Sequence, residues 1–211
     1  MFGGGPSLKN FDPERLAGRR RIAINRIVLP VDVAGRTVTD SAFDPADLRW
    51  PGIRDADVLY FGDRSWWQKD GPAVLAFFRG KYIVTSSRAT APNILNVMNT
   101  GMMGLETKTT GVRSGSNSGY QAINLAYHFG VRRIVLLGFD QNILAGESHV
   151  HGGYGMAPES VQHVLQARML PFFAHLVKPL AKAGVEVLNA SPESALTWWP
   201  KITLDEAARL T

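Results

Sequence analysis

Two histidines separated by a single residue are the side chains in this sequence best suited to move a proton. His149 and His151 lie in the stretch "HVHGGYG", which has the composition of a loop. An imidazole titrates near neutral pH, so a histidine beside a bound phosphate ester could act as a general base. The spacing could also present both rings to a metal ion, although no third ligand is obvious nearby. A plain surface position is the remaining alternative.

Small polar residues end four of the apolar, strand-like runs of the chain. They are Asn25, Asp63, Asp140 and Asn189. The carboxyl ends of parallel strands meet along one edge of a sheet, and ligands bind in the crevice there. Asn and Asp are also common in turns and caps, which explains each of these residues taken singly. The four together predict a ligand crevice.

The chain opens on a glycine-rich stretch, "GGGPSL" at 3–8, that has the composition of a phosphate-binding turn. Turns of this kind usually follow a buried strand. Only Met1 and Phe2 precede this one. We therefore expect the first strand of the sheet to be truncated or missing.

A second small-residue turn, "SNSG" at 116–119, leads into a helical pattern. Asn117 or Ser118 would cap that helix, and the free N–H groups of its first turn would attract an anion. Gly119 would let a ligand approach the backbone. Capping alone explains the same residues equally well.

The elements that must position these residues alternate along the chain. Strands are predicted at 20–28, 55–63, 81–87, 132–140 and 185–190. Helices are predicted at 73–80, 118–130 and 157–184, and Pro171 and Pro179 should kink or split the last of them. Alternation with short loops indicates an α/β fold with a largely parallel sheet. The weakly patterned stretch at 93–117 is expected to be either a substrate loop or a long connection.

Composition places the chain among ordinary globular proteins. Its 211 residues, 45% of them hydrophobic, suit one domain over 1–211 with a buried core. No apolar run is long enough for a membrane span and no signal-peptide pattern is seen, so we expect a cytoplasmic protein. The absence of cysteine excludes disulfides and thiolate chemistry.

The charge pattern leaves the choice of partner open. The net charge is +5, and the clearest basic clusters are at 19–21 and 132–133. A basic surface suits nucleic acid and equally a phosphate-bearing small ligand, and arginines just before a strand are usually solvated. The tryptophan pairs at 66–67 and 198–199 would each leave one indole near the surface, which keeps a homo-oligomer open.

Taken together, these stretches resemble a known superfamily. "GGGPSLKNFDPERL" looks like the "GPSLKNID" opening of bacterial sialyltransferases of glycosyltransferase family 42, and like the "GSGPSL" loop of the DUF115, pterin diphosphokinase-like proteins. "NSGYQAINLAYHFGVRRIVLLGFD" matches the second hallmark of that superfamily: a small-residue turn, a helix, a glycine, and a strand ending in Gly-x-Asp. "DVLYFGDRSWW" and "HVHGGY" most resemble short proteins of unassigned function encoded in phage and prophage genomes. The resemblance runs from Gly3 to about Ala195.

The resemblance implies a Rossmann-like, three-layer sandwich with a mostly parallel sheet that binds a nucleotide or nucleotide-sugar. The residues implied to bind the nucleotide are Gly4, Gly5, Pro6, Ser7, Asn25, Asp63, Ser118, Gly119 and Asp140. His151, with His149 beside it, corresponds roughly to the sialyltransferase base. The tyrosines that assist the leaving phosphate have no secure counterpart in this sequence, and Tyr154 is only a loose positional candidate. The chain has Gly4 where the family has an asparagine, and the insertion that covers the donor is absent or much shortened.

Two hypotheses follow. The first is a nucleotide-dependent transferase, glycosyltransferase-like and independent of metal as the sialyltransferases are. Its variant is pyrophosphoryl transfer from ATP, which would use Mg²⁺ with Asp63 and Asp140 as the available carboxylates. The second is a non-catalytic, accessory phage protein in the host cytoplasm that keeps the fold and binds nucleic acid or a partner.

Overall fold

The computed structural model describes residues 1–32, 34, 36–38, 48–62, 64–91, 93–151 and 156–210. The strands are β1 (Ile22–Ile24), β2 (Val31–Asp32), β3 (Leu48–Trp50), β4 (Val58–Phe61), β5 (Tyr82–Thr85), β6 (Ile94–Asn96), β7 (Met98–Asn99), β8 (Gly111–Val112), β9 (Arg133–Leu136) and β10 (Glu186–Asn189). The α-helices are α1 (Arg64–Phe77), α2 (Ser118–His128), α3 (Pro158–His163), α4 (Leu170–Lys182) and α5 (Leu204–Arg209). Short 3-10 turns form η1 (Pro6–Leu8), η2 (Pro13–Leu16) and η3 (Asn25–Val28), and a π-helical segment, η5 (Val164–Met169), joins α3 to α4.

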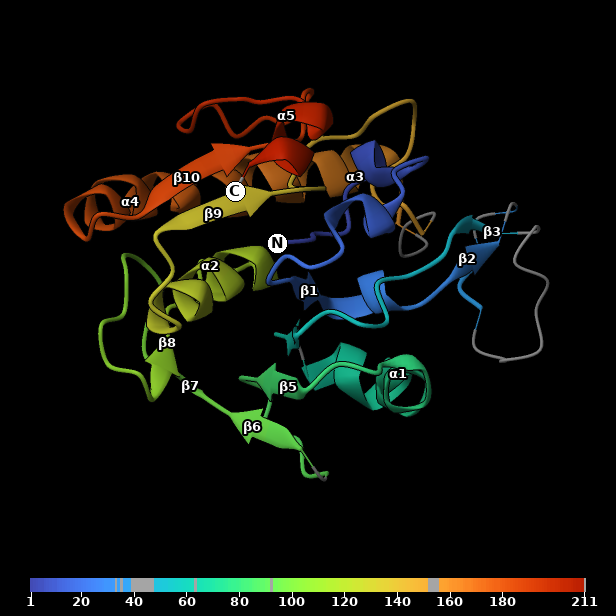
Figure 1. Ribbon diagram of the computed structural model, residues 1–211, viewed down its shortest axis with the longest axis horizontal. Helices are drawn as coiled ribbons and strands as arrows, with labels where there is room; N and C mark the ends of the chain where they lie inside the picture. Colours follow the sequence, from blue (N-terminus) through green and yellow to red (C-terminus); the bar gives the residue numbers. More distant parts are fainter. Residues whose placement is uncertain are drawn as a thin grey trace.

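Parallel strands form the centre of the molecule, as the apolar runs predict (Figure 1). β1, β4, β5 and β6 hydrogen-bond side by side in that order, and β9 pairs with β10. All of these pairings are parallel. Parallel neighbours need crossover connections, and α1 supplies one between β4 and β5 while α4 supplies one between β9 and β10. The predicted α/β class with a mostly parallel sheet is therefore confirmed.

The first residues of the chain join these two groups of strands. Phe2 forms a parallel bridge to Ala23 of β1 on one side and to Leu137, just after β9, on the other. Its N–H donates to the Ile22 carbonyl at 2.9 Å, and its carbonyl accepts from the Ile24 N–H at 3.1 Å. The truncated first strand expected from the sequence is thus reduced to one bridging residue, yet it occupies the centre of the sheet.

Alternate residues of each strand point to opposite faces of the sheet and build two cores. On one face, Ala23, Leu59 and Phe61 pack with side chains of α1, α5 and the 3-10 turns. On the other face, Ile24 and Tyr60 pack with side chains of α2 and α4. The sheet is therefore covered on both faces at β1 and β4, which explains why these two strands are apolar and buried along their whole length.

Two helices differ from their predicted bounds. The helix predicted at 73–80 begins earlier, at Arg64, and includes Pro72. The helix predicted over 157–184 is split, because η5 interrupts it just before Pro171, which has no backbone N–H to continue the α-helical ladder. No helix among the described residues is both long and apolar enough to cross a bilayer.

An antiparallel pair, β2 with β3, lies beside the parallel sheet at one side of the molecule (Figure 1). Trp50 anchors this pair, because its fully buried indole donates from Nε1 to the Ile27 carbonyl at 3.0 Å. The sequence pattern does not predict the pair, since strands of two and three residues are too short to show an alternating pattern.

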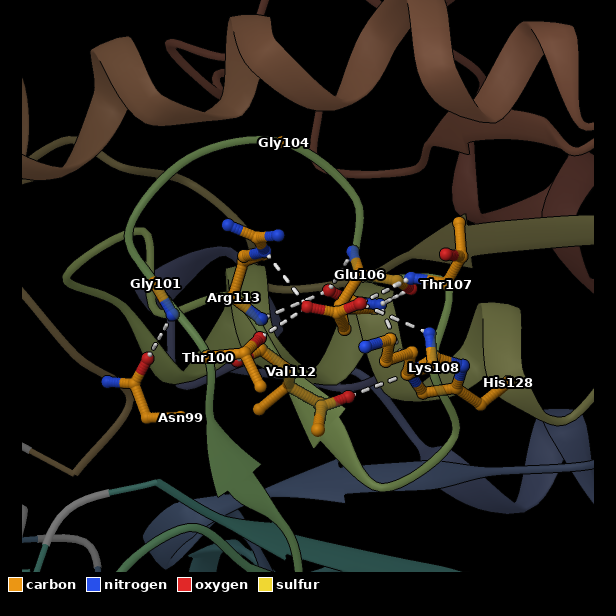
Figure 2. A network of polar contacts seen from close by, with 12 residues as sticks. Asn99, Thr100, Gly101, Gly104, Glu106, Thr107, Lys108, Val112, Arg113 and His128 are labelled. Atoms are coloured by element: carbon orange, nitrogen blue, oxygen red, sulfur yellow. Dashed lines mark hydrogen bonds and ion pairs between the residues drawn. The ribbon is translucent and has the colours of Figure 1, made fainter.

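The stretch at 93–117 is a connection braced around one buried carboxylate (Figure 2). Glu106 accepts hydrogen bonds from the Thr100 hydroxyl at 2.6 Å and from the two backbone N–H groups that follow it. Arg113 forms an ion pair with it at 3.2 Å. The Thr100 hydroxyl, the Lys108 N–H and the charge of Arg113 hold the pKa of Glu106 down at about 2.

Asn124 of α2 ties this connection to the helix. Its Oδ1 accepts from the backbone N–H groups of Glu106 at 2.9 Å and Arg113 at 3.1 Å, and its Nδ2 donates to the Glu106 carbonyl at 3.0 Å. The side chain is fully buried. The turn at 114–117 that leads into α2 is therefore held from both ends.

We predict that Phe2→Ala lowers the free energy of unfolding by about 3–5 kcal/mol, because it removes a buried ring at the junction of the two strand groups. Phe2 is 1% exposed, whereas Phe129 is 52% exposed. Phe129→Ala is the matched control and should change stability by about 0.5 kcal/mol or less. Urea denaturation followed by circular dichroism measures both variants, and equal losses would contradict the central role of Phe2.

We predict that Glu106→Gln lowers the melting temperature at pH 7 and flattens its dependence on pH. The pKa of Glu106 falls from its ordinary 4.5 to about 2 in the folded chain, so its contribution is present above pH 4.5 and is lost as the pH falls toward 2. Thermal melts at pH 7 and pH 3 test this. Glu186→Gln, which breaks an exposed pair with Arg133, is the control and should behave like the wild type.

Candidate functional site

Eight of the predicted site residues line one cavity of about 330 Å³ at the carboxyl ends of β1 and β9. They are Gly4, Gly5, Asn25, Ser118, Gly119, Asp140, His149 and His151. Pro6 and Ser7 lie beside the cavity rather than in its wall. Asn189, at the end of β10, is fully buried. Asp63 and Tyr154 are outside the described residues.

The glycine loop passes directly over the end of β9. A Cβ added to Gly5 would lie 2.3 Å from Asp140 Oδ2, so this position accepts only glycine. The Gly5 N–H donates to the Gly138 carbonyl at 2.9 Å. Gly4 faces the cavity instead, where an added Cβ would lie 3.3 Å from His149 Cδ2. The glycine loop therefore packs against the end of β9 at Gly5 and faces the imidazoles at Gly4.

Asp140 and Ser7 hold this loop in place. Both oxygens of the buried Asp140 carboxylate accept from Ser7, one from its N–H at 2.8 Å and the other from its hydroxyl at 2.6 Å. Burial raises the pKa of Asp140, and the hydrogen bonds from Ser7 oppose that rise. Ser7 and Asp140 therefore hydrogen-bond to each other and fix the glycine loop.

Three residues in the cavity wall have backbone in the left-handed region although none is glycine. They are Asn25 at φ 56°, Ser116 at φ 51° and Gln141 at φ 51°. Such conformations cost about 1–3 kcal/mol each and are concentrated at functional sites. Asn25 also accepts from the Gly62 N–H at 3.2 Å through Oδ1, which joins the ends of β1 and β4.

The N-terminus of α2 lies at the cavity, as predicted. Asn117 is the N-cap, and its Oδ1 accepts from the N–H groups of Gly119 at 2.6 Å and Tyr120 at 3.2 Å. Two of the N–H groups expected to attract an anion are therefore bonded within the chain. The Ser118 hydroxyl lies against Gly62, where an added Cβ would be 2.5 Å from it. An anion in the cavity would meet Ser118 and the positive end of the helix dipole.

The two histidines stack on each other beside the glycine loop. Their ring centroids are 4.8 Å apart and their planes differ by 21°. His151 is buried, and His149 Nδ1 lies 2.9 Å from the Ser148 hydroxyl oxygen. A Cβ added to Gly4 would lie 3.3 Å from His149 Cδ2 and 4.0 Å from His151 Nε2. A group bound over the glycine loop would therefore contact this pair.

The surroundings of His149 keep it uncharged. Burial lowers its pKa to about 4, and the positive charge of Arg26 adds to the effect. Arg26 is itself fixed by an ion pair to the buried Asp70 at 3.2 Å and by a hydrogen bond to the Thr37 hydroxyl at 2.9 Å. At neutral pH, His151 thus stacks on a neutral imidazole.

Two parts of the cavity wall were not among the predicted residues. Arg26 contributes a positively charged side chain to the wall. It directly follows Asn25, a predicted site residue, and this adjacency in the sequence could have indicated it. An apolar side comes from α3 and η5 and consists of Val161, Val164, Leu165 and Met169, together with Met156 just before α3. Helical spacing does not distinguish these residues from core positions, because packing decides which face of the helix meets the cavity.

The described residues contain no group of three or more His, Cys, Asp or Glu side chains that could hold a metal ion. Of the two carboxylates considered for Mg²⁺, Asp63 lies outside the described residues and Asp140 is doubly hydrogen-bonded to Ser7. In the part of the chain that the structure describes, Asp140 is therefore the one carboxylate of the two that could be considered for Mg²⁺, and it is already hydrogen-bonded to Ser7.

The basic clusters lie at the amino ends of the strands, away from the histidines. Arg20 pairs with Asp57 at 3.0 Å, and the buried Arg21 pairs with Asp55 at 2.6 Å. They border a separate cleft of about 560 Å³. The exposed Arg20 side chain agrees with the solvated-surface interpretation of this cluster.

Comparisons with known proteins support the fold through structure alone. Protein-family models give no match, and the curated proteins give no significant match. Three solved structures share the fold, each with 11% identity and a TM-score of 0.50. Two are the sialyltransferase CstII from Campylobacter jejuni, with cytidine-5'-monophosphate (96% of this chain and 83% of that chain covered) and with CMP-3FNeuAc (99% and 87%). The third is a variant of Cst-II in complex with CMP (95% and 83%). The predicted Rossmann-like fold is confirmed.

We predict that His149 makes stability depend on pH between about 6.5 and 4. Its folded pKa of about 4 lies below the ordinary 6.5, so the unfolded chain gains a proton first as the pH falls, and stability is lost through that range. Between pH 7.5 and pH 5, the wild type should lose roughly 2 kcal/mol more than His149→Gln. Urea titrations at both pH values measure the difference, and parallel losses would contradict the assignment.

Proposed function

We propose that this protein is a glycosyltransferase that takes a sugar from a CMP-type nucleotide donor, and that it is a divergent relative of the family 42 sialyltransferases. The observation that carries the proposal is the meeting of three features in one cavity of about 330 Å³: the glycine loop, the N-terminus of α2, and a stacked histidine pair. The cavity lies at the carboxyl ends of parallel strands, where such folds bind nucleotides. The likeness to CMP-bound sialyltransferase structures supports the same choice.

The donor phosphate would lie over Gly4 and Gly5. Backbone at a glycine can approach an anion closely, and the start of α2 at Ser118 adds the positive end of its dipole. Asn25, at the end of β1, would contact the ribose. The apolar side formed by α3 and η5 would take up the less polar part of the ligand.

His151 would act as the general base of the transfer. It removes the proton of an acceptor hydroxyl, the freed oxygen forms a bond to the anomeric carbon of the sugar, and the bond from that carbon to the phosphate oxygen breaks. CMP leaves with the bonding electron pair, and the proton stays on His151 until solvent removes it. Burial beside Gly4 gives His151 a position close to any bound phosphate.

His149 would assist without taking the proton. Its lowered pKa, of about 4, leaves it neutral when His151 becomes charged, so the pair does not carry two like charges. Arg26, fixed by Asp70, supplies part of that effect and adds a positive charge to a cavity proposed to hold an anion.

A thermal-shift screen with CMP, UDP, GDP and ATP, each with and without Mg²⁺, tests the donor class. We expect CMP to raise the melting temperature without Mg²⁺, because a ligand at about 100 times its Kd stabilises the folded state by about 2.7 kcal/mol. A shift with ATP that requires Mg²⁺ would favour pyrophosphoryl transfer instead. The absence of a shift with every nucleotide would favour the accessory, non-catalytic hypothesis.

A variant pair tests the base. With CMP-sialic acid as the donor, release of CMP should fall by about 10²-fold or more in His151→Ala while CMP still binds. His175→Ala is the matched control, since His175 is an exposed histidine of α4 and should leave release unchanged. Full turnover by His151→Ala would refute the assignment.

A further inference from the structure

Val150 lies between the two histidines and is bonded on both sides of its peptide backbone. Its N–H donates to the carbonyl of Gly4 at 2.9 Å, and the residue is 1% exposed. Its carbonyl accepts from Arg49 through Nε at 3.0 Å and also through Nη2. Because His149 and His151 flank this residue directly, these bonds set where both imidazoles stand relative to the glycine loop.

Arg49 comes from a distant part of the chain and is itself well fixed. It is in β3, next to Trp50, whose buried indole anchors that strand to the core through the Ile27 carbonyl. Neighbouring side chains of a strand point to opposite faces, so Trp50 points into the core while Arg49 reaches the histidine loop. The Arg49 side chain is 12% exposed.

A second contact of Arg49 holds the other end of the same loop. Its Nη1 donates to Glu147 Oε1 at 3.1 Å. Glu147 and Leu144 exchange two backbone hydrogen bonds, of 3.0 Å and 2.9 Å, which close the loop into a narrow turn. The guanidinium group of Arg49 therefore binds the loop at Glu147 and at Val150, on either side of His149.

We propose that Arg49 is a positioning residue that holds His149 and His151 against Gly4 by fixing the Val150 carbonyl and Glu147. The catalytic consequence rests on the proposed function, but the positioning does not. Lysine at this position would keep the positive charge and could reach one acceptor, yet it lacks the planar fork that bonds the carbonyl and the carboxylate together. The effect of Arg49 is therefore geometric as well as electrostatic.

The test compares Arg49→Ala and Arg49→Lys with Arg36→Ala. Arg36 is an exposed arginine that follows β2 and pairs with Asp32, which makes it a matched control. Histidine ring nitrogens are followed by NMR as the pH is changed, and the same samples are checked for folding by circular dichroism. We expect the pKa of His149 to rise from about 4 toward its ordinary 6.5 in Arg49→Ala, because the loop admits water. In Arg49→Lys the pKa of His149 should lie between its values in the wild type and in Arg49→Ala. In Arg36→Ala it should stay at the wild-type value.

A folded Arg49→Ala whose His149 pKa stays at the wild-type value would overturn the proposal. If Arg49→Ala does not fold, Arg49→Lys decides by the same measurement. The enzymatic arm uses CMP-sialic acid: turnover should fall by about tenfold or more in Arg49→Lys while the Kd for CMP changes by less than about twofold. An unchanged His149 pKa refutes the positioning role even where turnover is seen, whereas a shifted pKa without turnover in the wild type refutes the proposed function alone.

Discussion

The backbone of Met1, Phe2 and Gly3 joins the two groups of parallel strands, and the site depends on this junction. Hydrogen bonds to β1 on one side and to the end of β9 on the other fix the direction in which the chain leaves the sheet. The pairing then continues into the loop, since Gly3 donates to the Leu137 carbonyl at 2.8 Å and Gly5 to the Gly138 carbonyl. The glycine loop is therefore an extension of the sheet, and its position over the cavity follows from strand pairing rather than from the loop itself.

The histidines are placed by the same means. Gly4 presents its carbonyl to Val150, and Arg49 binds the Val150 carbonyl, so the loop that carries both imidazoles is held through its backbone. A Cβ at position 4 would approach the His149 ring to 3.3 Å, so any larger residue there would require the ring to shift by a few tenths of an ångström. Glycine at this position therefore suits the stacked pair.

Electrostatics disfavour the charged form of His149, one of the two stacked rings. His149 is desolvated and lies near Arg26, which is held in place by Asp70, so its charged form is disfavoured twice. At the N-terminus of α2, Asn117 already accepts from two N–H groups, which leaves fewer donors for the proposed anion. Both features follow from side chains fixed by the surrounding packing.

The class of the fold and eight residues of the cavity wall could be predicted from the sequence alone. Apolar β-branched runs specify buried parallel strands, and polar residues such as Asn25 and Asp140 at their ends must then meet at one edge. Three contacts are seen only in the folded chain: Phe2 joins the strand groups, Asp140 binds Ser7, and Arg49 reaches the histidine loop. These are contacts between residues about 20 to more than 100 positions apart, and local periodicity carries no information about which distant backbone group a side chain will meet.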